Sequence, residues 1–234
     1  MERITSGIEE LDPLLEGGYP KGKGILITGS TGSGKTIMGI HFLYSNCSSG
    51  KKGLLVLTRE LLEDVLLQAK TLGMDLEPFI DSGMLVVENI FQSRIQEAML
   101  SSRLGKGLEL AEKDRVGRIK ILSENADAVV LDSLAALSSL QKCPGNEPLS
   151  KFGLIYSVLA EHKCTSLFLM DESMHNRVHG FADNLVFGKI ELKLKEDSAS
   201  GKLSRSLSVT KMRATKSPPG NVLFELTSSG IRIK

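Results

Sequence analysis

The sequence is poor in cysteine and in long apolar runs. Its 234 residues contain three cysteines, Cys47, Cys143 and Cys164, which lie far apart and form no Cys-x-x-Cys pair. This odd, scattered set favours neither a disulfide framework nor a zinc site. No apolar run approaches the roughly 18 residues of a membrane span, and the first residues begin no basic-then-apolar signal peptide. We therefore expect a cytoplasmic protein with no membrane segment.

Proline and net charge are also low. With 7 prolines and 41% hydrophobic residues, the chain has enough apolar side chains for the core of a single α/β domain over residues 1–234. A formal net charge of +1 argues against strong attraction of the whole molecule to DNA. From Lys189 to Lys234, however, ten Lys or Arg residues stand against four Asp or Glu residues. Such a basic end is typical of a solvated face, and it could also serve a nucleic acid or an acidic neighbouring subunit.

The stretch from Gly24 to Thr36 predicts a strand, a phosphate loop and a helix in that order. Its glycines and its Lys35-Thr36 end have the Walker A spacing, Gly29-x-x-x-x-Gly34-Lys35-Thr36. Small residues let backbone N–H groups surround a β-phosphate, and the helix N-terminus adds its positive dipole end. We expect Lys35 to reach the β- and γ-phosphates and the Thr36 hydroxyl to bind Mg²⁺. The predicted nucleotide-binding residues are Ser30, Thr31, Gly32, Ser33, Gly34, Lys35, Thr36 and Ile37.

Further along, short apolar strands alternate with amphipathic helices. This alternation predicts a mostly parallel central sheet flanked by helices, with the ligand at the carboxyl ends of the strands. We expect the strands at 25–27, 54–57, 84–87, 128–131 and 165–170, and helices at 37–44, from 61 to Gly73, at 91–124 in two pieces around Gly105 and Gly107, and at 149–160.

One of these strands ends in an acid that has the Walker B form. Ala128–Leu131 are apolar and Asp132 follows, so its carboxylate is the expected second Mg²⁺ ligand beside Thr36. Ser133 could form a hydrogen bond in the site or cap a helix.

The two ends of the chain have a different pattern. Residues 5–22 form an N-terminal lead-in segment with a helical turn around 9–15, which Gly17 and Gly18 close. Residues 184–234 alternate apolar and polar side chains and predict two antiparallel β-hairpins, 185–194 with 207–210 and 222–226 with 231–233.

The lead-in segment, taken together with the phosphate loop, resembles the start of a KaiC-type domain of the RecA superfamily. The resemblance rests on Thr5-Ser6-Gly7-Ile8, Leu11-Asp12, Leu15, Gly17-Gly18 and Pro20-x-Gly22, followed by Walker A. It implies a single RecA-like P-loop ATPase domain that uses ATP and Mg²⁺ and forms a homo-oligomeric ring, expected to be a hexamer.

Two further features follow from this resemblance. Lys211 and Arg213 resemble the Lys-x-Arg segment that reaches the ATP of the adjacent subunit in KaiC-type rings, although two basic residues on a strand could also be an ordinary exposed face. Glu172 follows the strand at 165–170 and is a candidate γ-phosphate sensor, with a solvated acid as the alternative.

The sequence departs from the family after its second strand. The family has two glutamates there, and the first activates the attacking water, but this chain has Thr58-Arg59-Glu60. If Glu60 takes that role, the protein is a slow ATPase in which Lys35, Glu60, Lys211 and Arg213 are the catalytic candidates. If it does not, the protein is a non-hydrolysing ATP-binding regulator or scaffold.

The segment 173–182 is a second departure, because it looks shorter than the loop that faces DNA in RecA relatives. It holds one arginine and two histidines, His175 and His179, without basic–aromatic interleaving. A DNA recombination or repair ATPase therefore remains a third and less favoured alternative. We expect nucleotide state to be coupled to assembly or to a regulatory protein partner. The two histidines lack a third ligand for a metal site.

Overall fold

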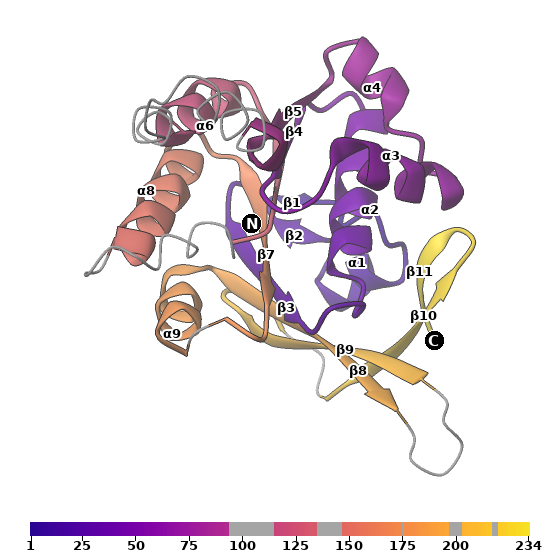
Figure 1. The fold of residues 1–234 in the computed structure, drawn as a ribbon. Coiled ribbons are helices and arrows are strands. Elements are labelled where there is room, and N and C mark those ends of the chain that lie inside the picture. Colours follow the sequence, from indigo (N-terminus) through magenta and orange to yellow (C-terminus); the bar gives the residue numbers. More distant parts are fainter. Residues whose placement is uncertain (94–114, 135–146, 175, 197–202, 217–219) are drawn as a thin grey trace, which may run out of the picture.

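A nine-stranded sheet with helices on both faces forms the body of the molecule (Figure 1). The structure is a computed structural model of the 234-residue chain and describes residues 1–93, 115–134, 147–174, 176–196, 203–216 and 220–234. The strand order is β11-β10-β9-β8-β3-β7-β6-β4-β5. The predicted break around Gly105 and Gly107 lies outside the described residues.

One half of the sheet is parallel, as the sequence predicts. It consists of β3 (Gly24–Gly29), β4 (Gly53–Leu57), β5 (Leu85–Asn89), β6 (Ala128–Asp132), β7 (Thr165–Asp171) and β8 (Gly188–Glu196). All residues of β3, β4 and β6 are buried, because helices cover both faces of these central strands. The carboxyl ends of β3, β4, β6 and β7 therefore meet at one edge of the sheet.

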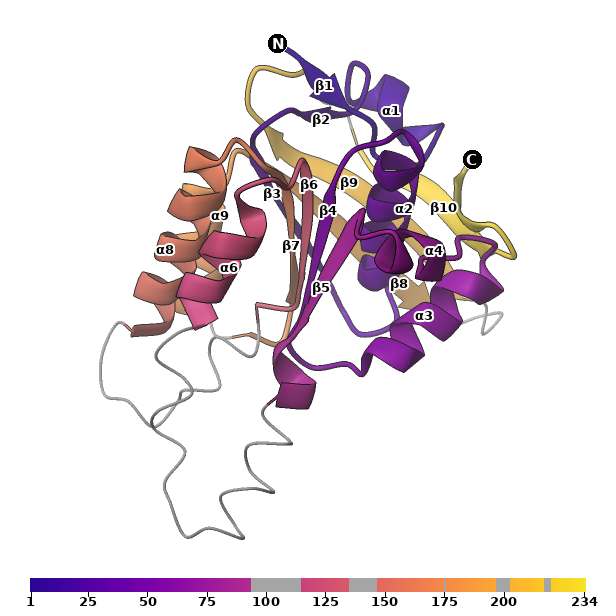
Figure 2. The same ribbon diagram turned by 90° about the horizontal axis from the view of Figure 1, so that it is seen from above.

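The helices divide between the two faces, as Figure 2 shows. One face carries α2 (Lys35–Ser48), α3 (Leu62–Thr71) and the short α4 (Glu77–Asp81), and the other carries α6 (Arg115–Ser123), α8 (Glu147–Glu161) and α9 (Asn176–Leu185). Alternate residues of β3 supply the two cores: Ile25 and Ile27 pack with α2, and Leu26 packs with α8. The sequence did not predict α4.

The antiparallel half contains the two predicted hairpins. β9 (Leu203–Met212) pairs with β8, and β10 (Val222–Thr227) pairs with both β9 and β11 (Gly230–Ile233). The first hairpin starts later than predicted, at Gly188 rather than residue 185, because α9 extends to Leu185.

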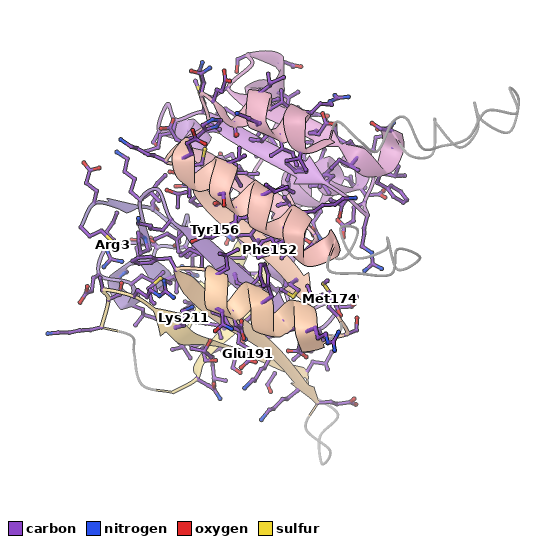
Figure 3. All side chains as sticks on the ribbon, turned by 90° about the vertical axis from the view of Figure 1, so that its left-hand side faces the viewer. Arg3, Phe152, Tyr156, Met174, Glu191 and Lys211 are labelled. Atoms are coloured by element: carbon purple, nitrogen blue, oxygen red, sulfur yellow. The ribbon has the colours of Figure 1, made fainter. Side chains whose placement is uncertain are left out.

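Helix α9 also corrects the expectation of a loop over 173–182, since residues 176–182 are helical. Val178, Phe181, Ala182 and Leu185 have the i, i+3, i+4, i+7 spacing of one helix face and pack into the second core. Phe152 and Tyr156 lie on the side of α8 that faces α9 (Figure 3), and the rings of Phe152 and Phe181 are 6.3 Å apart. Ala182 is buried and the other three side chains of this face are partly buried against the core, which favours a helix here.

The lead-in segment folds as a small antiparallel pair, β1 (Arg3–Ile4) with β2 (Tyr19–Pro20), around the turn α1 (Leu11–Leu14). The carboxylate of Asp12 holds the segment together, because it accepts hydrogen bonds from the Thr5 hydroxyl (2.6 Å) and the Ser6 N–H (2.7 Å).

The N-terminal and C-terminal segments contact each other near Arg3, and His41 of α2 contacts both of them. The Arg3 guanidinium donates to Thr215 Oγ1 (2.9 Å) and to the Ala214 carbonyl (3.2 Å). The His41 ring on α2 contacts the Gly7 carbonyl through Nδ1 (3.0 Å) and accepts the Ile231 N–H at Nε2 (2.9 Å). Among the described residues, no helix has the length and apolar character needed to cross a membrane.

Candidate nucleotide-binding site

The phosphate loop lies between the end of β3 and the start of α2, where the sequence places it. Gly32 and Gly34 have φ values of +79° and +106°, which only glycine adopts without strain. At Gly29 a Cβ atom would lie 2.6 Å from the Leu192 carbonyl oxygen, so this position also requires glycine. No side chain caps the N-terminus of α2 at Gly34, and its positive dipole end therefore faces the loop.

Lys35 projects from the first turn of α2 back across this loop. Its Nζ donates to the carbonyls of Gly29 (2.6 Å) and Ser30 (2.8 Å) and lies 3.4 Å from Asp171 Oδ2. Asp171 ends β7, the neighbour of β3 in the sheet. Burial opposes ionisation of this carboxyl, but hydrogen bonds from Ser173 and the nearby ammonium of Lys35 outweigh it and lower the pKa of Asp171 to about 2.

Thr36 and Asp132 come together as the Walker motifs predict. The Thr36 hydroxyl donates to Asp132 Oδ2 over 2.7 Å, across the gap between α2 and the end of β6. Burial raises the pKa of Asp132 above its ordinary value, while the hydrogen bond from Thr36 and the charge of Lys35 act in the opposite direction. A hydroxyl and a carboxylate oxygen at this separation are ligands that suit Mg²⁺.

Thr58 ties the segment that carries Arg59 and Glu60 to the Walker B strand. Its N–H donates to the Asp132 carbonyl (2.7 Å), and its hydroxyl donates to the Ser133 carbonyl (2.7 Å) and accepts the Ser133 N–H (2.9 Å). Glu60 follows two residues later. Partial burial raises the pKa of Glu60, the charges of Asp132 and Asp64 raise it further, and Lys35 lowers it. Glu60 therefore lies close enough to Lys35 of the Walker A motif and Asp132 of the Walker B strand for their charges to shift its pKa.

These groups line one cleft of about 480 Å³, a size typical of sites for small ligands. The lining residues come from the phosphate loop and from the ends of the neighbouring strands: Thr31, Gly32, Gly34, Lys35, Thr36, Ile37, Arg59, Glu60, Gln68, Asp132, Ser133, Asp171 and Leu226. The donor set of loop amides, one ammonium and an oxygen pair fits a magnesium-bound nucleotide.

The sequence missed several residues of this region. Asp171 lies in the cleft, whereas Glu172 is exposed and is not among the lining residues; its N–H donates to the Gly29 carbonyl (3.3 Å). Arg205 of β9 reaches the phosphate loop, where its guanidinium lies 3.5 Å from the Gly32 carbonyl oxygen. Leu226 of β10 lies near Gly34. These contacts appear only when β7, β9 and β10 take their places in the folded sheet.

Lys211 and Arg213 lie away from this cleft. In the sheet, Lys211 of β9 pairs with Lys189 of β8, which in turn pairs with Leu26 of β3. Leu26 lies three residues before Gly29, where the phosphate loop begins, so Lys211 is displaced from that loop by about 10 Å along the strands. Its ammonium binds the Asp183 carbonyl at the end of α9 (Figure 3), and Arg213 binds the Asn184 carbonyl (3.3 Å). Burial lowers the pKa of Lys211, and the charges of Arg213 and Lys189 lower it further, whereas the charge of Asp183 raises it.

The basic end of the chain is partly paired. Among its described residues, four cations form ion pairs: Lys189 with Asp183, Lys193 with Glu191, Arg232 with Glu10 and Lys234 with Glu225. His175 lies outside the described residues, and His179 contacts the Asp171 carbonyl (3.2 Å). The described part of the chain holds no group of three or more His, Cys, Asp or Glu residues placed to bind a metal ion.

Comparison with known proteins identifies the family. The family model described as "ATPase: KaiC" matches residues 4–234. The chain belongs to the KaiC family of ATPases. This KaiC-family chain is 31% identical over 236 residues to a UPF0273 protein of Pyrococcus horikoshii, covering 98% of this chain and 92% of the relative. It is 30% identical over 240 residues to a UPF0273 protein of Thermotoga maritima, covering 100% and 96%.

A solved structure shares the fold of this KaiC-family chain. The crystal structure of a KaiC-like protein from Pyrococcus horikoshii superposes with a TM-score of 0.80 at 23% sequence identity, and the match covers 100% of this chain and 99% of the other. The predicted RecA-like α/β fold and the resemblance to a single KaiC domain are therefore confirmed. The roles of individual site residues stay predictions.

Proposed function

We propose that this KaiC-family protein binds magnesium-ATP in the cleft beside α2, hydrolyses it slowly and assembles as a ring, expected to be hexameric, in which nucleotide state governs assembly or contact with a regulatory protein. The observation that carries the proposal is the convergence of Lys35, the Thr36–Asp132 pair and Glu60 on one cleft.

Each group in the cleft has a distinct part in binding. The amides from Ser30 to Ile37 and the ammonium of Lys35 would hold the phosphates, and Thr36 with Asp132 would hold Mg²⁺. A bound Mg²⁺ would neutralise negative charge on the phosphates. Lys35 must then exchange its contacts with the loop carbonyls for contacts with phosphate oxygens.

Glu60 is the group of the described cleft best placed to accept a proton from water. Its carboxylate lines the cleft with Asp132, and the Thr58–Ser133 hydrogen bonds fix the segment on which it lies. Its raised pKa makes it a stronger base than an ordinary exposed glutamate. Removing such a base slows hydrolysis by about 10²–10⁴-fold.

The position of Arg213 supports a role in the neighbouring subunit. Lys211 and Arg213 lie toward the end of the sheet opposite the chain's own phosphate loop, so a second copy must present them to a nucleotide. A head-to-tail contact of this kind repeats into a closed ring when its rotation closes. An arginine delivered in this way stabilises the charge that develops on the transferred phosphoryl group.

The first test is steady-state ATP hydrolysis with light scattering in the presence and absence of magnesium-ATP. We expect slow turnover and nucleotide-dependent assembly of the wild type, and loss of turnover in Glu60→Gln. Glu63→Gln is the matched control, because Glu63 is exposed on the first turn of α3 and does not line the cleft. Equal rates in both variants would refute the role of Glu60.

Mixing two inactive variants tests the shared site. Lys35→Ala removes the phosphate contact and Arg213→Ala removes the neighbour's cation, so neither ring should turn over ATP. In mixed rings, a cleft from the Arg213→Ala subunit meets an intact Arg213 from the Lys35→Ala subunit. Random mixing in equal amounts should restore about a quarter of wild-type activity. No recovery in rings shown to be mixed would mean that Arg213 does not act across the interface.

A second candidate function is a non-hydrolysing ATP-binding regulator. The observation that favours it is Arg59, which lines the cleft at the position of the family's first glutamate. In that case neither the wild type nor Glu60→Gln turns over ATP, and assembly still responds to magnesium-ATP.

A further inference from the structure

The carboxylate of Asp171 lies beside the ammonium on which a nucleotide's terminal phosphate depends. Its Oδ2 accepts the Thr31 hydroxyl (3.2 Å) and lies 3.4 Å from Lys35 Nζ. Its Oδ1 accepts the Ser173 N–H (3.0 Å). Each of the two oxygens thus has its own partners, and the side chain cannot turn away from the phosphate loop without losing these contacts.

The same ammonium has to serve a bound nucleotide. A phosphate oxygen in hydrogen-bond contact with Lys35 Nζ would lie at most about 6 Å from Asp171 Oδ2, given the 3.4 Å already separating Nζ from Oδ2. A diphosphate leaves the γ-position open, so Lys35 can keep its contact with Asp171. A triphosphate places further negative charge in this space or draws Lys35 away from the carboxylate.

We propose that Asp171 is a specificity-determining residue whose negative charge weakens the binding of nucleoside triphosphate relative to diphosphate in this cleft. The inference rests on the proposed function, and it adds which phosphate state the site prefers. An ionised carboxylate suits this role, and the hydrogen bonds from Ser173 keep Asp171 ionised at neutral pH.

The size of the effect follows from the distance. Two unit charges about 6 Å apart repel by an amount that changes a binding constant by about 3-fold in water and about 100-fold at the dielectric of a protein surface. Part of this repulsion falls on the β-phosphate, which both nucleotides carry and which Lys35 also reaches, and part falls on the γ-phosphate, which only the triphosphate carries. The ratio of the two dissociation constants cancels the shared part and reports the part that falls on the γ-phosphate.

The test is calorimetric titration of the full chain with magnesium-ADP and with magnesium-AMP-PNP, a triphosphate that is not hydrolysed. Asp171→Asn keeps the size of the side chain and an acceptor oxygen for the Ser173 N–H, and it removes the charge. Glu63→Gln is the matched control, since Glu63 is an exposed acid that does not line the cleft. We expect Asp171→Asn to tighten AMP-PNP relative to ADP by at least about 3-fold, with no such change in Glu63→Gln.

A smaller change in the ratio, weaker AMP-PNP binding, or the same change in Glu63→Gln would overturn the proposal. Tight binding of ADP shows that each variant is folded, and Asp171→Ser replaces Asp171→Asn if that variant does not bind ADP. If the wild type binds neither nucleotide, the proposed function itself fails and this inference fails with it. If it binds both and the ratio does not respond, only the role of Asp171 is refuted.

Discussion

Acid should weaken the fold through His41, which joins the two ends of the chain. The Ile231 N–H donates to Nε2, so the neutral ring carries its hydrogen on Nδ1 and donates it to the Gly7 carbonyl. Burial lowers the pKa of His41 below its ordinary value, although the Gly7 carbonyl and Glu10 act in the opposite direction. The folded chain therefore takes up this proton less readily than the unfolded chain.

The sign and size of the effect follow. Because the unfolded chain binds more protons, stability rises with pH, is complete above the unfolded pKa of about 6.5 and is lost as pH falls from there toward the lowered folded pKa. Protonation removes the acceptor of the buried Ile231 N–H, at a cost of about 1–3 kcal/mol. For a chain of this length that corresponds to a Tm lower by about 2–12 °C.

Thermal unfolding of the wild type and of His41→Gln between about pH 7.5 and pH 5.5 measures this loss of Tm, because His41→Gln lacks the ring that takes up the proton. His162→Gln is the control for the other histidines. The wild type and His162→Gln should lose more Tm on acidification than His41→Gln does. Parallel curves for all three proteins would refute the reasoning.

Three further predictions concern contacts within the protein that do not involve a bound nucleotide. Gly230→Ala should lower the free energy of unfolding by about 2–4 kcal/mol in urea titrations, since its φ is +93° and a Cβ would lie 2.1 Å from His41 Nε2; Gly50→Ala, at φ +80° with open space around it, should cost less, and equal losses would exclude the clash as the cause. Thr58→Val should cost about 1–3 kcal/mol of stability and Thr58→Ser much less, because serine retains the hydroxyl that bonds the Ser133 backbone; similar losses would contradict this. Arg3→Ala should leave ADP affinity unchanged in calorimetry and reduce ATP turnover of the assembled protein, because Arg3 holds the turn that follows Arg213; unchanged turnover would separate that turn from hydrolysis.

Much of the fold could be predicted because its signals are local. The apolar strand at Ile25–Ile27, the glycine loop and Lys35-Thr36 are contiguous, and the strand that ends in Asp132 has a composition that only a buried strand tolerates. Helix α8 has an apolar face at regular spacing. These elements lie where the sequence places them.

The remainder depends on contacts between distant segments. Nothing local distinguishes Asp171 from Glu172, because the choice depends on the pairing of Asp171 with Gly29 in the sheet. The apolar residues of α9 are a weak helix signal in the sequence alone, because their contacts with the second core form only in the folded chain. The sequence therefore predicts a loop there. Lys211 and Arg213 were matched by resemblance, and their distance from the chain's own cleft follows only from the strand register.

The bonds from Arg3 to Thr215 and from His41 to Ile231 set an order for folding during synthesis. The partner of Arg3 lies 212 residues further along the chain, so at usual elongation rates about 10–40 s pass before it is made. Throughout that interval Arg3 lacks its partners Thr215 and Ala214, although β1 already pairs with β2, and the Ile231 N–H that His41 accepts is made later still. A growing chain can thus complete its parallel sheet only when β7 and β8, the two neighbours of β3, have been made, and it completes the closure of the fold later still, when β11 has been made.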